Sequence, residues 1–191
     1  MEIQFKKLYP DVQIPAYATI GSAGFDLVAH NFKEYYIAGN KTINPNMKSA
    51  KAEKIAEGLW QLPDGRQIKC STYEWGEPAS EVQMYPNSRL LVGCGFSVAI
   101  PEGYVMDIRT RSGGALKSGL VVLNSPGTID SDYRGEIGAI LHNNSTDSII
   151  IRKGFKVAQA LVLKFDVVIF KEVQELSATE RGTGGFGSTD K

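Results

Sequence analysis

The segment from Asn124 to Glu136 holds the densest group of residues that could carry chemistry, NSPGTIDSDYRGE. An Asp is ionised at neutral pH, so Asp130 or Asp132 could act as a general base if neighbouring groups aimed it at a water molecule. The same composition also suits a turn in which both Asp residues cap the backbone and Arg134 pairs with Glu136. The residues alone slightly favour the turn and leave both interpretations open.

A second polar group lies between Arg109 and Gly119, with the sequence RTRSGGALKSG. Backbone N–H groups exposed by glycine, together with the planar fork of arginine, are a common way to hold phosphate oxygens. The group matches no Walker A motif, and basic glycine-containing turns are common on protein surfaces. By itself it therefore indicates an anion site only weakly.

Both groups lie among segments that are predicted to be β-strands. Apolar runs rich in Val and Ile recur through the second half of the chain, and Gly, Pro, Asn or Asp residues separate them. Many short strands joined by tight turns predict an all-β barrel or sandwich with Greek-key or jelly-roll connections. The clearest strands are Leu90–Ile100, Tyr104–Arg109, Leu120–Leu123, Glu136–Leu141, Ser148–Arg152 and Val157–Phe170.

Two regions break this rhythm. Residues from about 30 to 87 are predicted to be an insertion, in which Met47–Glu57 forms a short amphipathic helix. Gly58–Cys70 is predicted to be a hairpin that turns at Asp64-Gly65. At the other end, residues 177–191 are rich in Gly, Ser and Thr, which suits either a frayed tail or a segment that folds over a ligand.

Composition excludes several classes of protein. Lys plus Arg and Asp plus Glu each total 21, so no overall basic charge favours nucleic acid or an anionic membrane. The N-terminus lacks the apolar stretch of a signal peptide and no run is long enough to span a bilayer, which predicts a cytoplasmic protein, or one in the host cytosol if it is viral. The two cysteines, Cys70 and Cys94, have neither disulfide nor zinc spacing and are expected to be reduced.

Five segments, read in order, resemble the five motifs of the trimeric dUTPases. This resemblance covers nearly all of the chain outside the insertion. It implies a jelly-roll β-barrel domain at residues 1–176, interrupted by the insertion at about 30–87, and a flexible arm at residues 177–191. The segments are AGFDL at 23–27, RSG at 111–113, GTIDSDYRGE at 127–136, GFKVAQ at 154–159 and RGTGGFGST at 181–189.

The resemblance implies hydrolysis of dUTP to dUMP and diphosphate, which keeps uracil out of DNA and supplies dUMP for dTMP synthesis. Asp130 would activate the water that attacks the α-phosphorus. Tyr133 would stack on the deoxyribose and leave no room for a 2′-hydroxyl. The other base and sugar contacts would come from Asn124, Gly127, Thr128, Ile129, Gly138 and Phe186.

Further roles follow from the same resemblance. Asp26 would contact Mg²⁺ through water, with the metal carried mainly by the triphosphate. The sites would lie between the subunits of a homotrimer, and the arm of one chain would close over the site of another. The phosphate contacts would come from Arg111, Ser112, Gly113, Gln159, Arg181, Gly187, Ser188 and Thr189. One departure is Phe155-Lys156, which stands where the family usually has Asp-Arg and loses a bidentate arginine fork.

Two alternatives stay open. The dCTP deaminases and their bifunctional relatives share the fold and parts of the second and third motifs, although the arm motif and Tyr133 favour dUTP hydrolysis. The chain could also use its insertion to bind a regulatory protein. Trp60, Tyr73 and Trp75 are the only features that support such a partner, and packing of these aromatic residues within the insertion explains them more simply.

Overall fold

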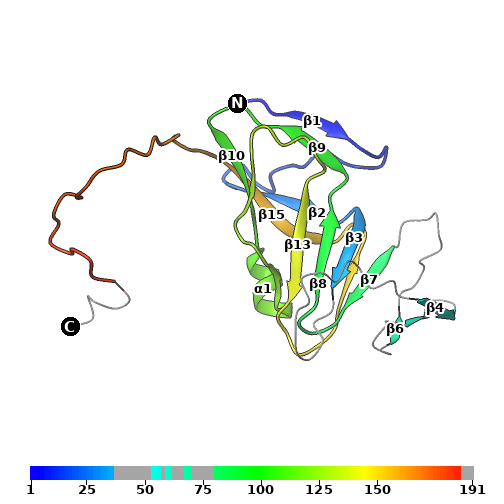
Figure 1. The fold of residues 1–191 in the computed structure, drawn as a ribbon. Helices are drawn as coiled ribbons and strands as arrows, with labels where there is room; N and C mark the ends of the chain where they lie inside the picture. Colours follow the sequence, from blue (N-terminus) through cyan, green and yellow to red (C-terminus); the bar gives the residue numbers. More distant parts are fainter. Residues whose placement is uncertain (37–52, 57–58, 62–66, 70–79, 186–191) are drawn as a thin grey trace.

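The computed structural model describes residues 1–36, 53–56, 59–61, 67–69 and 80–185, and within them the chain is built of β-strands with one short helix (Figure 1). The elements are β1 (Gln4–Lys7), β2 (Phe25–Val28), β3 (Asn31–Tyr36), β4 (Glu53–Ala56), β5 (Leu59–Gln61), β6 (Gln67–Lys69), β7 (Glu81–Met84), β8 (Arg89–Gly93), β9 (Phe96–Ala99), β10 (Tyr104–Arg109), α1 (Ser112–Ser118), β11 (Leu120–Val122), β12 (Gly127–Ile129), β13 (Gly138–Asn143), β14 (Ile149–Arg152) and β15 (Lys156–Lys164). This architecture confirms the prediction of an all-β fold.

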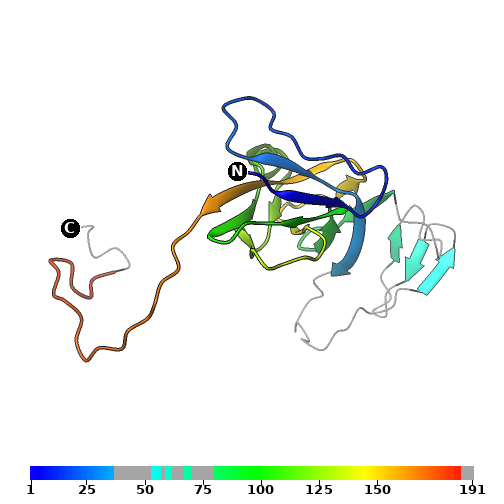
Figure 2. The same ribbon diagram turned by 90° about the horizontal axis from the view of Figure 1, so that it is seen from above.

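Two antiparallel four-stranded sheets form the body of the molecule (Figure 2). One sheet has the strand order β12-β10-β15-β2 and the other has the order β11-β13-β8-β3, while β1 pairs with β9 and β7 pairs with β14. Buried side chains alternate with less buried ones along β8 and β13, as expected for strands that bury one face. The two sheets share one hydrophobic core, to which both contribute buried residues such as Leu27, Met106, Ala160, Val92 and Leu141.

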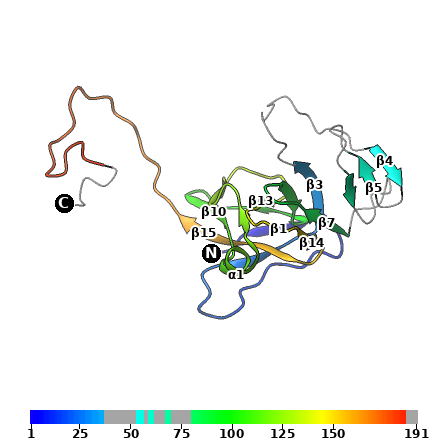
Figure 3. The ribbon, with the colours of Figure 1, turned by 90° about the horizontal axis from the view of Figure 1, so that it is seen from below.

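The two flanks of the predicted insertion pair with strands outside it. Strand β3 pairs with β8, and β7 pairs with β14, although both strands lie within the range 30–87. Between them, β4, β5 and β6 form a separate three-stranded antiparallel sheet beside the two main sheets (Figure 3). The predicted hairpin is confirmed by the pairing of β5 with β6, whereas its turn at Asp64-Gly65 lies outside the described residues.

The predicted helix at Met47–Glu57 is wrong for residues Glu53–Ala56, which form strand β4. Helix propensity is a weak preference in so short a segment, and the backbone of β4 instead pairs with β5. Residues 47–52, like Cys70, Tyr73 and Trp75, lie outside the described residues. Cys94 is a free, buried thiol, as the sequence predicted.

Two further differences concern the second half. The predicted strand Leu90–Ile100 is divided into β8 and β9, because the chain changes sheets at Cys94-Gly95. The predicted strand Val157–Phe170 ends at Lys164, and the chain then runs away from the body without a partner strand (Figure 1). In the part of the chain that the structure describes, no helix has the length and apolar character needed to cross a membrane.

Candidate functional site

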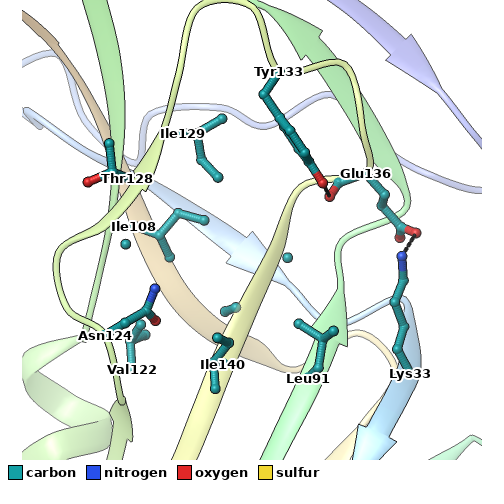
Figure 4. Close-up of a pocket in the computed structure, with 13 residues that line it drawn as sticks. Lys33, Leu91, Ile108, Val122, Asn124, Thr128, Ile129, Tyr133, Glu136 and Ile140 are labelled. Atoms are coloured by element: carbon teal, nitrogen blue, oxygen red, sulfur yellow. Dashed lines mark hydrogen bonds and ion pairs between the residues drawn. The ribbon is translucent and has the colours of Figure 1, made fainter.

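A pocket of about 200 Å³ lies between the two main sheets and is the cavity most relevant to the predicted chemistry (Figure 4). Six residues that the sequence assigned to the base or sugar line it: Asn124, Gly127, Thr128, Ile129, Tyr133 and Gly138. Seven others complete its wall: Lys33, Leu91, Ile108, Val122, Glu136, Ala139 and Ile140. The pocket is thus lined mainly by apolar residues with a few polar groups, which is the usual composition of a small-molecule site.

Strand pairing positions one side of this pocket. Gly127 and Thr128 on β12 lie opposite Ile108 and Asp107 on β10. Asn124 precedes β12 in the turn that leads from β11, and its side chain points toward the pocket in Figure 4. A short strand held at an edge of the sheet can therefore present both its backbone and the Asn124 amide to a ligand.

The loop between β12 and β13 positions Tyr133. The Tyr133 hydroxyl donates a hydrogen bond to the backbone carbonyl of Glu136, at 3.2 Å. Arg134 closes the loop by donating to the carbonyl oxygens of Ser131 and Tyr133, at 2.6 and 2.9 Å. Arg134 therefore stabilises the loop through backbone carbonyl groups. The sequence had suggested a pairing of Arg134 with Glu136, but Glu136 pairs with Lys33 instead.

Glu136 and its partner Lys33 are charged residues of this site to which the sequence analysis assigned no ligand contact. The Glu136 carboxylate accepts hydrogen bonds from the Asn31 side-chain amide and the Gly95 backbone N–H, both at 2.7 Å, and forms an ion pair with Lys33 at 2.6 Å. Its side chain is only 8% exposed. The three donors are far from Glu136 in sequence, so no local pattern could have indicated the cluster.

The pKa of Glu136 is lowered by these contacts. Burial alone would raise the pKa, but the hydrogen bonds from Lys33, Asn31 and Gly95 and the charge of Lys33 outweigh that effect. The folded protein therefore holds Glu136 ionised to lower pH than the unfolded chain does. The resulting stabilisation is present above the ordinary pKa of 4.5 and is lost as the pH falls through the lower folded value.

Glu136→Gln should accordingly destabilise the protein at neutral pH by about 1.5–3 kcal/mol, the contribution of a hydrogen bond to a charged group. The difference in free energy of unfolding between wild type and variant should shrink as the pH falls below 4.5, because the wild-type carboxylate becomes protonated. Urea unfolding at neutral and acidic pH measures this difference. A difference that stays constant over this range would contradict the assignment.

A second polar cluster brings together Asp26, Arg111, Lys156 and Gln159. Arg111 Nε donates to Asp26 Oδ1 and Lys156 Nζ contacts Asp26 Oδ2, both at 2.8 Å. Arg111 Nη1 also donates to the Lys156 carbonyl at 3.1 Å, and Gln159 Nε2 donates to the Thr110 carbonyl at 3.0 Å. Strand register explains the grouping, because Asp26 on β2 lies opposite Gln159 on β15.

The pKa of Asp26 is also lowered. Burial would raise the pKa, but the hydrogen bond from Lys156 and the charges of Arg111 and Lys156 prevail. Lys156, which lacks the bidentate fork of an arginine, forms an ion pair with Asp26 through its single ammonium group. Two cations around one partly exposed carboxylate leave net positive charge, which suits phosphate oxygens.

The other predicted residues differ in how far they can be placed. Ser112 and Gly113 begin helix α1 and are exposed; the sequence predicted only a glycine-containing turn there, because two consecutive glycines disfavour a helix. Asp130 is exposed directly after β12, and it is not one of the residues that line the pocket. Arg181 is exposed on the C-terminal segment, whereas Phe186, Gly187, Ser188 and Thr189 lie outside the described residues.

Asp130 and the Asp26 cluster are far apart within one chain. Asp26 pairs with Gln159, and Gln159 pairs with Arg109 at the end of β10. Ile129, the residue before Asp130, pairs instead with Met106, which lies three residues earlier on β10. With strands about 4.8 Å apart and a rise of about 3.3 Å per residue, a flat sheet of this register separates the backbones of Asp130 and Asp26 by about 19 Å.

Two solved structures of phage dUTPases have a fold similar to that of this chain. A mutant dUTPase of Staphylococcus bacteriophage 80alpha, solved with dUpNHpp, matches with a TM-score of 0.67 and 21% identity, covering 98% of both chains. A mutant dUTPase of phage phi11 of S. aureus, in which a structural Mg(II) ion is coordinated, matches with a TM-score of 0.62 and 19% identity, covering 93% of this chain and 100% of that one. The fold therefore defines a jelly-roll β protein of the class to which these enzymes belong.

Sequence comparison gives the family. The family model described as dUTPase matches residues 78–190. The deoxyuridine 5′-triphosphate nucleotidohydrolase of Caulobacter vibrioides is 38% identical over 191 residues, 99% of this chain and 94% of that protein. The same enzyme of Wolinella succinogenes is 36% identical, covering 100% of this chain and 95% of that protein. The chain belongs to the dUTPase family.

Proposed function

We propose that the chain is a dUTP diphosphatase, which hydrolyses dUTP to dUMP and diphosphate. The observation that carries this proposal is the pocket, which gathers all six described residues that the sequence assigned to the base and sugar. Relatives that align over almost the whole chain are named deoxyuridine 5′-triphosphate nucleotidohydrolases, which supports the same activity.

Uracil fits the polar edge of the pocket. The base presents acceptor, donor and acceptor groups in sequence, which the Asn124 amide and the backbone of β12 can pair, with Gly138 close by. Cytosine would leave one buried group unpaired, and thymine would press its methyl group against the tight turn. Unpaired buried polar groups penalise the wrong base strongly. The Tyr133 ring would lie against the deoxyribose and exclude a 2′-hydroxyl.

The chemical step assigned to Asp130 is proton removal from a water molecule. That water attacks the α-phosphorus, a new P–O bond forms, and the bond from the α-phosphorus to the bridging oxygen of the β-phosphate breaks. The electron pair leaves with diphosphate, while Asp130 holds the proton. Arg111, Ser112, Gly113 and Gln159 would hold phosphate oxygens during this step.

The residues present fit a magnesium ion carried by the substrate. In the described part of the chain, no group of three or more His, Cys, Asp or Glu side chains is arranged to hold a metal. Mg²⁺ needs no such cage, because it keeps several waters and binds through substrate phosphates. The Asp26 carboxylate has acceptor capacity beyond Arg111 and Lys156, and could take a hydrogen bond from a metal-bound water. When bound, the ion would neutralise charge on the departing diphosphate.

A homotrimer with sites between its subunits is part of the proposal. A base must lie within hydrogen-bond reach of its water, and the strand register puts the backbones of Asp130 and Asp26 about 19 Å apart in one chain. The cluster of a second chain could supply the phosphate contacts. The segment after β15 supports association too, because its large apolar residues are exposed: Val167 79%, Val168 66%, Ile169 93%, Phe170 94% and Leu176 88%. On a second chain these side chains would be buried.

The arm at residues 177–191 would complete the site as a lid. In the fifth motif, at residues 181–189, Phe186 would cover the uracil. The phosphates would be contacted by Arg181, Gly187, Ser188 and Thr189. Substrate contacts would offset the entropy lost when a glycine-rich segment becomes ordered.

A substrate panel tests the activity. Purified protein with Mg²⁺ should release diphosphate from dUTP with a kcat/KM that is at least about 100-fold greater than for dCTP, dTTP or UTP. Ammonia release from dCTP would favour the deaminase alternative instead. If none of the four nucleotides were turned over, the proposed enzymatic activity would be wrong and a nucleotide-binding role would remain.

A further inference from the structure

The orientation of Tyr133 depends on a contact that packing alone does not provide. The residue is 44% exposed, so neighbouring side chains surround its ring incompletely. Its hydroxyl donates a hydrogen bond to the Glu136 carbonyl at 3.2 Å. This bond holds the end of the ring against the backbone just before β13. The angle of the ring therefore follows the position of the Glu136 backbone.

The Glu136 backbone is in turn fixed through its own side chain. Asn31 and Lys33, both on β3, and the backbone N–H of Gly95, between β8 and β9, all contact its carboxylate. Figure 4 shows the Lys33 side chain reaching up to Glu136 at the edge of the pocket, beside Tyr133. Contacts from two separate segments hold a nearly buried carboxylate more firmly than a single contact would.

Two glycines make room for this chain of contacts. A Cβ atom at Gly93, on β8, would collide with the Asn31 side-chain amide and the Glu136 carboxylate. A Cβ atom at Gly135 would collide with the Tyr133 ring and its hydroxyl. Both ends of the connection from β3 to Tyr133 thus depend on close approach to a backbone without a side chain.

Lys33 also balances charge at the site. A lone carboxylate in the wall of the pocket would repel a nucleotide that carries a triphosphate. The Lys33 ammonium lies 2.6 Å from Glu136 Oε2 and lines the same pocket. The ion pair allows a buried acid to anchor the loop without an uncompensated negative charge facing the ligand.

We propose that Glu136, held by Asn31 and Lys33, is a positioning residue that sets the angle of the Tyr133 ring and thereby the rejection of nucleotides with a 2′-hydroxyl. The inference rests on the proposed function, in which Tyr133 lies against deoxyribose. Glu136 acts on selectivity through the Tyr133 hydroxyl and does not act on the reacting phosphate.

A double-mutant cycle tests this coupling. Values of kcat/KM for dUTP and UTP would be measured for wild type, Glu136→Gln, Tyr133→Phe and the double variant. Glu136→Gln keeps the shape of the side chain but loses the ion pair with Lys33. It should lower the ratio of the dUTP to the UTP value by about tenfold, as expected when a positioned group shifts slightly. Tyr133→Phe, which removes the hydroxyl, should lower the ratio similarly.

The decisive result is the double variant. If Glu136 acts through the Tyr133 hydroxyl, Glu136→Gln should change the ratio by less than about twofold when Phe already occupies position 133. Equal effects in both backgrounds would overturn the inference, because a purely structural role does not depend on that hydroxyl. Lys33→Met, which removes the same ion pair from β3, should reproduce the behaviour of Glu136→Gln.

Glu81→Gln is the matched control, because Glu81 on β7 also pairs with a cation, Arg152 at 2.8 Å, but does not line the pocket. It should leave the ratio of dUTP to UTP values unchanged. A wild-type protein without dUTP turnover would refute the proposed function itself, and the inference with it. Normal dUTP turnover with an unchanged ratio in Glu136→Gln and Lys33→Met would refute the inference alone.

Discussion

Asp130→Asn is expected to lower kcat for dUTP by about 10²–10⁴-fold, the usual contribution of general base catalysis. Asparagine has almost the same shape as aspartate but cannot take a proton from water. Substrate binding should therefore survive, with little change in the dissociation constant of a non-hydrolysable dUTP analogue. Steady-state diphosphate release and isothermal titration calorimetry measure the two quantities separately.

Asp132→Asn is the matched control, because Asp132 is exposed on the same loop two residues away. The variant should keep kcat within a few-fold of wild type. If Asp132→Asn abolished turnover and Asp130→Asn did not, the base would be Asp132. If neither variant lost activity, the base would have to lie outside this loop.

Arg111→Ala is expected to lower kcat/KM for dUTP by roughly 100-fold, since hydrogen bonds to charged groups contribute about 1.5–3 kcal/mol each. The variant loses a phosphate ligand and also removes one of the two cations that pair with Asp26, so the net positive charge of the cluster is lost. Arg111→Lys should recover only part of the loss, because lysine cannot form the planar fork that holds Asp26 and the Lys156 carbonyl together.

Arg152→Ala controls for the loss of an arginine. Arg152 lies on β14 and also forms an ion pair at 2.8 Å, but with Glu81 instead of Asp26. Its removal should leave kcat/KM within about twofold of wild type, as is typical of exposed ion pairs. Equal losses in Arg111→Ala and Arg152→Ala would show that the effect is general destabilisation rather than lost phosphate contact.

The strands of the second half could be predicted because their signal is local. Tyr104–Arg109 was predicted with its observed bounds, and Ser148–Arg152 to within one residue, since β-branched runs between turn residues determine such strands. Helix α1 was missed because its glycines disfavour a helix, and tertiary context overrode that preference. The end of β15 was misplaced because apolar composition continues to Phe170, while a strand also requires a neighbour to pair with.

The candidate site divides in the same way. The base and sugar residues were identified by resemblance, since Asn124 to Gly138 is one continuous segment that forms one wall of the pocket. The contacts of Glu136 with Asn31 and Lys33 span more than one hundred residues of sequence, so only the folded structure brings them together. Likewise, Asp26 and Lys156 carry opposite charges in the sequence, but the pairing of β2 with β15 was needed to make them neighbours.

Mixing two inactive variants tests most directly whether one dUTP site joins the Asp130 loop of one chain to the Arg111 cluster of another. Asp130→Asn and Arg111→Ala chains would be dissociated, mixed in equal amounts and reassembled, and diphosphate release from dUTP would be measured. About a quarter of wild-type activity should return. A working site needs an Arg111→Ala chain to supply Asp130 and an Asp130→Asn chain to supply Arg111, and random mixing gives each of the two positions the required chain half of the time. No recovery beyond the sum of the two variants, in mixed assemblies verified by mass spectrometry, would contradict a shared site and require both residues to act within one chain.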